Sequence, residues 1–343
     1  MAPGLEARRG GMKRRGFFLG KFMPPHSGHL HVCETALGMV RELTILVCST
    51  STEPLPGAVR HKWMQAAMPK ARVLHLHRDL PQLPEEDPEF WRIWRDAIRE
   101  HHPESIDIVF AGEDYGRRLA DELGAEAHII DRTASDRAIS ASAIRANPAA
   151  HWRFIAAPAR FHFQKRLTLL GPESVGKTTL AARLAKHFDT RLVPEYGRTY
   201  DEKYMQSRFK QGKGWRVEDL LAIAETHAAM RSAISPLAGP LLIEDTDALM
   251  TAVWAEHLLG APAPRLEVLA KESLADHYLL LTPETPWADD GVRYAGRDEV
   301  RQWFFDAAKA RLDRFGARYT VISGADWDAR EQQAVTVAEG MLG

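Results

Sequence analysis

The chain of 343 residues exceeds the length at which a single hydrophobic core usually stops growing, so its length predicts two domains. Apolar residues make up 45% and charged residues 27%, which is typical of globular proteins and argues against disorder over most of the chain. The 45 basic and 46 acidic side chains give a formal net charge of -1. No bulk positive field is therefore available to hold a nucleic-acid backbone, and we expect no nucleic acid among the partners.

The sequence also argues against export and against a membrane location. The basic N-terminus is followed by GKFMPPHSGH, which interrupts the apolar run that a signal peptide requires. No other run approaches the roughly 18 apolar residues of a membrane span. Cys33 and Cys48 both lie in apolar stretches and are expected to be buried thiols. We therefore expect a cytoplasmic protein, with residues 1–13 as a disordered extension.

Two successive strand and helix patterns predict an α/β fold in each half. In the first half, apolar runs such as GFFLG, LTILVCS and IDIVFAG alternate with helix-like stretches, which predicts a Rossmann-like domain with a parallel sheet over residues 14–150. Residues 151–164 have two prolines nearby and no sustained period, so they are expected to form a linker. A second alternation, including RLTLLG, LLIEDTD and HYLLLT, predicts a P-loop domain with a parallel sheet over residues 165–343.

Residues 171–178 read GPESVGKT and lie between a predicted strand and a predicted helix, the context that a phosphate-binding loop requires. The backbone of such a loop surrounds the phosphates of ATP, and the helix directs its positive end at them. Lys177 is expected to neutralise the β- and γ-phosphates, and Thr178 to hold Mg²⁺. The expected ATP contacts are Gly171, Glu173, Ser174, Val175, Gly176, Thr178 and Thr179.

Three further segments are candidates for the acceptor side of this site. In LLIEDTD, Asp245 is expected to organise Mg²⁺ and Asp247 to bind substrate, with an acidic solvated turn as the alternative. In TRLVPEYGRTY, Glu195 could accept the proton of an attacking hydroxyl and Arg198 could bind phosphate or ribose, with a surface ion pair as the alternative. The choice of general base stays open between Glu195, Asp245 and Asp247.

The third segment, PETPWADDGVRYAGR, is typical of a lid over the nucleotide. Arg293 and Arg297 are expected to reach the transferring phosphoryl group, and Trp287 to stack on a flat ring. An ordinary charged loop is the alternative interpretation.

The first half carries its own phosphate-binding pattern. GKFMPPHSGH places His26 and His29 between the first predicted strand and a helix, where anions bind. ISASAIRANP adds Ser140 and Ser142 before a helical stretch with Arg145. Together they indicate nucleotidyl transfer, in which an acceptor phosphate attacks the α-phosphate of ATP.

These motifs together resemble the NadR family, which pairs nicotinamide mononucleotide (NMN) adenylyltransferase with nicotinamide riboside kinase. GKFMPPHSGH, FWRIW, ISASAIRANPAAHWRFI, PEYGRTY, IEDTD and PWADDGVR carry the resemblance. It implies that the second half phosphorylates nicotinamide riboside to NMN and that the first half adenylylates NMN to NAD. By motif match, Lys21, His26, His29, Ser140 and Arg145 would carry adenylyl transfer, and Lys177, Thr178, Glu195 and Asp245 phosphoryl transfer.

Three aromatic or basic residues of the first half remain candidates for substrate contact. Arg60 and Trp63, in PGAVRHKW, match a substrate position of the family. Trp91 lies on one helical face with Trp94, and the pattern favours core packing over stacking on substrate.

Two alternative functions remain open at this point. One is a fused coenzyme A synthase, although PEYGR and PWADDGVR argue against it. The other is a kinase whose first domain senses NAD or NMN without catalysis. Association into a homo-oligomer is compatible with the sequence.

Overall fold

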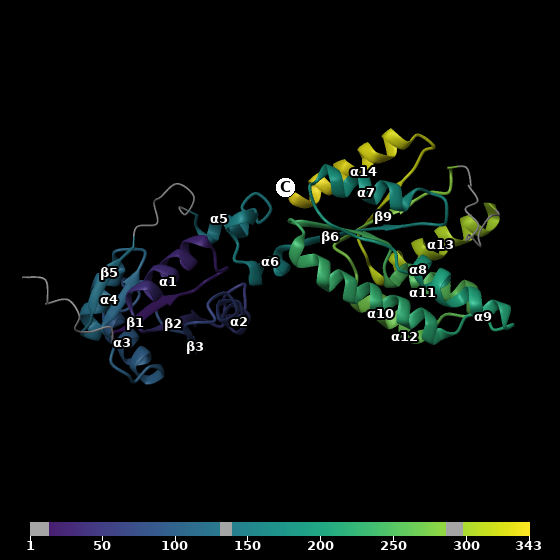
Figure 1. Ribbon diagram of the computed structural model, residues 1–343. Coiled ribbons are helices and arrows are strands. Elements are labelled where there is room, and N and C mark those ends of the chain that lie inside the picture. Colours follow the sequence, from purple (N-terminus) through teal and green to yellow (C-terminus); the bar gives the residue numbers. More distant parts are fainter. Residues whose placement is uncertain (1–13, 131–138, 286–297) are drawn as a thin grey trace, which may run out of the picture. The chain divides into compact units, whose positions relative to one another are not determined.

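The computed structural model describes residues 14–130, 139–285 and 298–343, and the chain divides into two compact units, residues 1–162 and 163–343 (Figure 1). The expected extension 1–13 and the lid residues Trp287, Arg293 and Arg297 lie outside the described residues. Within the described ranges, no helix combines the length and the apolar character needed to cross a bilayer.

The first unit is built on a parallel sheet of five strands, in the order β3-β2-β1-β4-β5. The strands are β1 (Arg15–Gly20), β2 (Glu42–Ser49), β3 (Arg72–His77), β4 (Ile108–Ala111) and β5 (Glu126–Ile129). β1 pairs with β2 on one side and β4 on the other, so the chain reverses its direction of winding beside β1. Ligands of open α/β sheets bind at such a reversal, outside the carboxyl ends of the strands.

Helices cover both faces of this sheet, because β1 carries apolar side chains on each face. Phe18 packs with α1 (Ser27–Met39) and α2 (Gly57–Ala67), whereas Phe17 packs with α3 (Phe90–His101) and α4 (Tyr115–Leu123). Both cysteines belong to these two cores and are buried free thiols, as expected. The unit continues through α5 (Ala141–Ala146), the 3₁₀ turn η1 (Trp152–Phe154) and α6 (Ala157–Phe163), so the expected linker 151–164 contains regular structure.

The second unit is built on another parallel sheet of five strands, in the order β10-β9-β6-β8-β7. Its strands are β6 (Lys165–Leu170), β7 (Leu192–Val193), β8 (Leu241–Asp245), β9 (His277–Leu281) and β10 (Tyr319–Ile322). The central strand β6 pairs with β8 and β9. The predicted phosphate loop follows β6, and the predicted acidic residues Asp245 and Asp247 lie at the end of β8 and just beyond it. Since β6 and β8 are parallel neighbours, both segments lie at the same edge of the sheet.

Two helical layers enclose the second sheet. One layer is α7 (Lys177–His187) and α14 (Trp327–Leu342), and the opposite layer is α10 (Val217–Ile234), α11 (Ala248–Leu259), α12 (Pro264–Glu272) and α13 (Asp298–Phe315). Smaller elements connect them: α8 (Gly197–Tyr200), the π-helix η2 (Asp201–Met205), α9 (Gln206–Lys210) and η3 (Ser235–Leu237). Side chains of β8 alternate between the layers, with Ile243 facing α7 and Glu244 facing α10.

Candidate active sites

The loop between β6 and α7 has the backbone conformation of a phosphate cradle. Gly171, Ser174 and Gly176 have φ angles of 142°, 60° and 82°, which lie outside the regions that most residues adopt. A Cβ atom added at Gly176 would lie 2.1 Å from the ring of Trp327, the first residue of α14. Gly176 is therefore required both for the turn and for the packing of α14 against the loop.

Three side chains distant in the sequence hold the carbonyl groups of this loop. Arg301 donates to the carbonyl of Glu173 (3.3 Å), Thr285 to that of Ser174 (2.9 Å) and Arg330 to that of Val175 (3.1 Å). Arg301 and Arg330 are each about 1% exposed. With its carbonyl groups bonded on the protein side, the loop can present backbone N–H groups to phosphate.

The catalytic candidates of the second unit cluster at this loop. The Lys177 ammonium donates to the carbonyl of Pro172 (2.7 Å), and the Thr178 hydroxyl donates to Oδ2 of Asp245 (2.6 Å). Burial raises the pKa of Asp245, and the charge of Lys177 opposes that rise. Burial also raises the pKa of Glu195, again against the charge of Lys177 and with the help of the charge of Asp245. The charge of Lys177 therefore offsets only part of the effect of burial on the pKa values of these two carboxyl groups.

The same cluster fits a magnesium ion. Asp245 is 1% exposed, and its Oδ1 has no hydrogen-bond partner within the described ranges. A buried carboxylate oxygen beside a threonine hydroxyl is a suitable donor set for Mg²⁺, which takes its remaining ligands from phosphate and water. Thr178 and Asp245 are therefore the residues that would hold the ion.

A cavity extends from the loop between α10 and α11. Glu195, Arg198 and Asp247, which the sequence predicted for this site, all line it. Asp247 caps α11: Oδ1 accepts from the Leu249 backbone N–H (2.9 Å), and Oδ2 accepts from the Tyr278 hydroxyl (2.8 Å). Burial, with help from the charge of Glu244, raises the pKa of Asp247 to about 6. The carboxyl group is thus held deep in the cavity wall at a free-energy cost.

Aromatic side chains that the sequence analysis did not single out also line this cavity, namely Tyr196, Trp215 and Trp254. Trp254 follows Asp247 by seven residues, with Met250 between them, so the three share one face of α11. This helical spacing could have identified Trp254 from the sequence. An aromatic lining beside a phosphate loop is suited to a small molecule with a flat ring.

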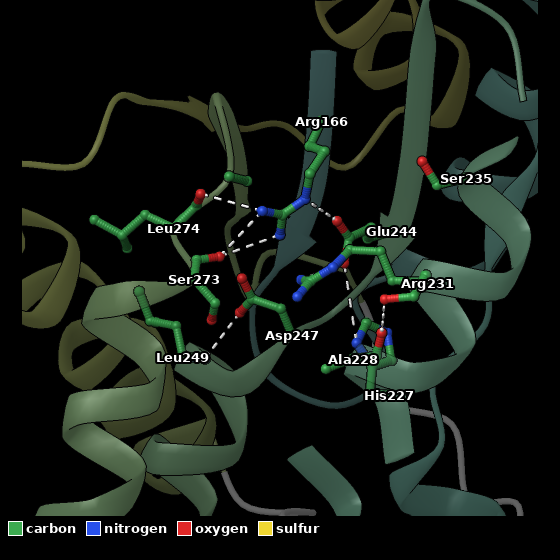
Figure 2. Close-up of polar contacts among 12 residues, drawn as sticks. Arg166, His227, Ala228, Arg231, Ser235, Glu244, Asp247, Leu249, Ser273 and Leu274 are labelled. Carbon is green, nitrogen blue, oxygen red and sulfur yellow. Dashed lines mark hydrogen bonds and ion pairs between the residues drawn. The ribbon is translucent and has the colours of Figure 1, made fainter. Parts of the chain in front are cut away.

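A buried charge network lies beneath the cavity (Figure 2). Glu244, which is not exposed at all, forms ion pairs with Arg166 (2.5 Å) and Arg231 (3.5 Å), and its Oε2 lies 3.9 Å from Nδ1 of His227. Arg166 also donates to the backbone carbonyls of Ser273 and Leu274. Burial lowers the pKa of His227, although the nearby charge of Glu244 acts in the opposite direction. His227 thus lies in the wall of the cavity with a lowered pKa, which favours the neutral imidazole.

In the first unit, the histidine loop links β1 to α1. His26 caps α1, and its Nδ1 accepts a hydrogen bond from the Gly28 backbone N–H (3.2 Å). In the neutral imidazole the proton consequently lies on Nε2, which becomes a donor. The rings of His26 and His29 have their centroids 3.8 Å apart. The loop therefore brings two imidazoles together at a helix N-terminus, as the sequence predicted.

Lys21 and Arg60 meet at a carboxylate that the sequence analysis missed. Glu53, with its side chain 8% exposed, forms ion pairs with Lys21 (3.2 Å) and with Arg60. The Arg60 guanidinium is fully buried and also donates to the backbone carbonyls of Lys21 (2.5 Å) and Cys48 (3.2 Å). The expected substrate contact of Arg60 stays a prediction, and in this structure the side chain supports the Lys21 backbone from inside the protein.

The serine and arginine motif lies against the histidine loop. The Ser140 hydroxyl caps α5 by accepting from the Ala143 backbone N–H (3.1 Å). Arg145 donates to the Met23 carbonyl (2.6 Å) and to the Ser142 hydroxyl (3.1 Å). The contact between Arg145 and Met23 joins two motifs, because these residues lie 122 positions apart in the chain.

Two tryptophans of the first unit pack inside it. Trp63 is 8% exposed and lies edge-on to His162, with ring centroids 5.3 Å apart. Trp91 packs against the core beneath α3, in edge contact with Phe90 (5.0 Å). For Trp91 these contacts favour the packing alternative over stacking on substrate.

Comparisons with known proteins agree with this division. A model of cytidylyltransferase-like domains matches residues 17–147, and a model of AAA domains matches residues 166–330. A nicotinamide-nucleotide adenylyltransferase of Thermococcus kodakarensis is 30% identical over 120 residues, which cover 34% of this chain and 62% of that protein. The two halves therefore match two different family models.

Two similarities extend over nearly the whole chain. The trifunctional NAD biosynthesis/regulator protein NadR of Escherichia coli is 26% identical over 358 aligned residues, which cover 99% of this chain and 86% of that protein, and its counterpart in Salmonella typhimurium is also 26% identical. Crystal structures of a NadR protein with NR, and with NAD and AMP-PNP, match the fold with TM-scores of 0.76 and 0.75 at 24% identity over 96% of the chain. With both domains present in the same order, the chain is therefore similar to NadR proteins along nearly its full length.

Proposed function

We propose that this protein is a bifunctional enzyme of NAD salvage. Its second unit phosphorylates nicotinamide riboside to NMN with ATP, and its first unit adenylylates NMN to NAD with release of pyrophosphate. The observation that carries this proposal is that each unit has its own set of phosphate-binding groups, in a chain similar to NadR over 99% of its length.

In the kinase unit, the loop residues 171–178 bind the phosphates of ATP through backbone N–H groups, and Lys177 supplies a positive charge. Thr178 and Asp245 would hold Mg²⁺, and the bound ion would supply positive charge to the phosphates of ATP. Arg198, exposed at the cavity, binds phosphate.

Glu195 is the proposed general base of the kinase unit. Asp245 already accepts from Thr178, and both oxygens of Asp247 accept hydrogen bonds from the protein. Glu195 lines the cavity and its pKa is raised by burial, so it is suited to take the proton of the attacking 5′-hydroxyl. Asp247 then serves substrate binding deeper in the cavity.

In the adenylyltransferase unit, an oxygen of the NMN phosphate attacks the α-phosphorus of ATP, and pyrophosphate leaves. The acceptor is already an anion, so no general base is required. The Nε2–H of His26, together with His29, Lys21 and Arg145, stabilises the charge that develops on the phosphate oxygens. Glu53 and Arg60 position Lys21.

The test is mass spectrometry of the purified protein with nicotinamide riboside, ATP and Mg²⁺, following NMN, NAD and pyrophosphate over time. We expect NMN first and NAD second, and neither product after chelation of Mg²⁺. NMN without NAD would favour a first unit that senses NAD or NMN. Neither product would overturn the nicotinamide assignment, and phosphopantetheine and dephospho-coenzyme A would then test the coenzyme A synthase alternative.

A further inference from the structure

The wall of the kinase cavity contains a buried imidazole nitrogen without a partner. His227 lies on the face of α10 that also carries Leu220 and Ile223, and all three line the cavity. The residue is 4% exposed, and across the described parts of the chain its Nε2 makes no hydrogen bond. Buried polar atoms are nearly always bonded, so an unbonded one in a side chain that lines a substrate cavity indicates a missing ligand group.

The surroundings of His227 determine which kind of group that is. Its Nδ1 lies 3.9 Å from Oε2 of Glu244, and that carboxylate is fully buried (Figure 2). The two groups are too far apart for a hydrogen bond, but the charge of the carboxylate favours the neutral tautomer whose proton lies on Nδ1. Nε2 then carries a lone pair and can only accept a hydrogen bond.

Glu244 does not require His227 for its own charge balance. Arg166 and Arg231 already bind the same carboxylate, and both are protonated at any physiological pH. A histidine present only to satisfy Glu244 would therefore be redundant. Asp247, which also lines the cavity, is likewise an acceptor.

We propose that His227 is a specificity-determining residue of the kinase site, whose Nε2 accepts a hydrogen bond from an N–H or O–H donor of the nucleoside. This inference rests on the proposed kinase function and specifies which substrate groups the cavity wall recognises. The nicotinamide carboxamide and the ribose hydroxyls are such donors. A carboxylate is not a donor, and its charge would be repelled by Asp247 when that residue is ionised.

The experiment uses the full chain with three substitutions of His227. The amide oxygen of His227→Gln reaches the position of Nε2, that of His227→Asn reaches only the position of Nδ1, and His227→Leu removes both. We expect the KM for nicotinamide riboside to rise about 10- to 100-fold in His227→Leu and His227→Asn, and to recover largely in His227→Gln. The KM for ATP and the adenylylation of supplied NMN should not change.

Arg231→Lys is the matched control, because Arg231 contacts Glu244 without lining the cavity. Its KM for nicotinamide riboside should stay within about twofold of the wild-type value, since a lysine keeps the charge beside Glu244. A similar rise in this control and in His227→Leu would assign the effect to the buried network and overturn the proposal.

Nicotinic acid riboside distinguishes the two possible donors. If the carboxamide is the donor, His227→Leu should lose the preference for the amide over the acid; if a ribose hydroxyl is the donor, both substrates should lose affinity equally. Equal KM values for His227→Gln and His227→Asn would overturn the inference even if His227→Leu failed to fold. The proposed function would survive that result, whereas a wild-type protein that makes no NMN would overturn both.

Discussion

The two phosphate sites of this chain are proposed to serve similar reactions, but they are built from different chemical groups. The site of the second unit is made largely of backbone, with a loop whose carbonyls are bonded by Thr285, Arg301 and Arg330. It adds carboxyl groups whose pKa values are raised by burial. The site of the first unit is made of cationic and imidazole side chains, Lys21, His26, His29 and Arg145 among them.

The difference follows from the acceptor in each proposed reaction. A neutral hydroxyl needs a base and a metal-assisted leaving group, so carboxyl groups are placed beside the phosphates despite their charge. An acceptor phosphate is already an anion and needs only charge stabilisation, so donors suffice. The pKa pattern of a phosphate site can thus indicate which kind of acceptor it serves.

The sharpest test of this comparison is Lys177→Ala. The charge of Lys177 acts on both Glu195 and Asp245, and its ammonium is expected to neutralise the β- and γ-phosphates. Its removal should therefore lower kcat for NMN formation about 1000-fold. Adenylylation of supplied NMN should stay nearly intact, as measured by pyrophosphate release. Loss of both activities would mean that the two sites are not independent.

The reciprocal test is His29→Ala. Removing one imidazole of the His26 and His29 pair should lower the rate of NAD formation from NMN about 100-fold, because a donor to the developing charge is lost. Riboside phosphorylation should be unchanged. His31→Ala, on the same helix, is the control, and an equal loss there would indicate damage to α1 instead.

Asp247→Asn tests whether the second site tolerates an unfavourable charge for the sake of function. The pKa of Asp247 is raised from 3.8 to about 6, so the folded state binds this proton more tightly than the unfolded state. Its stabilisation is fully present below about pH 4, declines as pH rises, and is lost above about pH 6.

The asparagine variant can keep the cap of α11 and has no charge to bury. Relative to wild type, its free energy of unfolding should rise by about 1 to 2 kcal/mol between pH 5 and pH 7.5, with a weaker affinity for nicotinamide riboside. Urea unfolding at several pH values measures this, using the transition that ATP shifts. A stability difference independent of pH would show that Asp247 carries no such penalty.

Ser140→Ala should have the smallest effect. The hydroxyl caps α5, and the loss of a cap costs about 1 kcal/mol. If this free energy is lost from ATP binding, the KM for ATP in adenylylation should rise about fivefold. Kinase parameters should not respond. An unchanged KM would remove Ser140 from the ATP site and leave it a purely local role.

The strand and helix order, both phosphate motifs and the acidic end of β8 could be predicted from the sequence because local patterns encode them. The contacts of Arg301 and Arg330 with the loop could not, since they join residues 128 and 155 positions apart. Glu53 was missed for a related reason: nothing in its own segment indicates that Lys21 and Arg60 converge on it. The burial of Arg60 could not be predicted because a buried arginine and an exposed one have the same sequence pattern.

The contact between Gly176 and Trp327 gives the kinase loop an intrinsic optical probe. The indole lies directly behind the glycine whose backbone N–H would face the nucleotide, and Trp327 is 43% exposed, so part of its fluorescence reports on solvent. Filling of the loop by a phosphate changes the electric field at this ring. Emission from Trp327, isolated by comparison with a Trp327→Phe protein, can therefore follow nucleotide arrival in real time without a label.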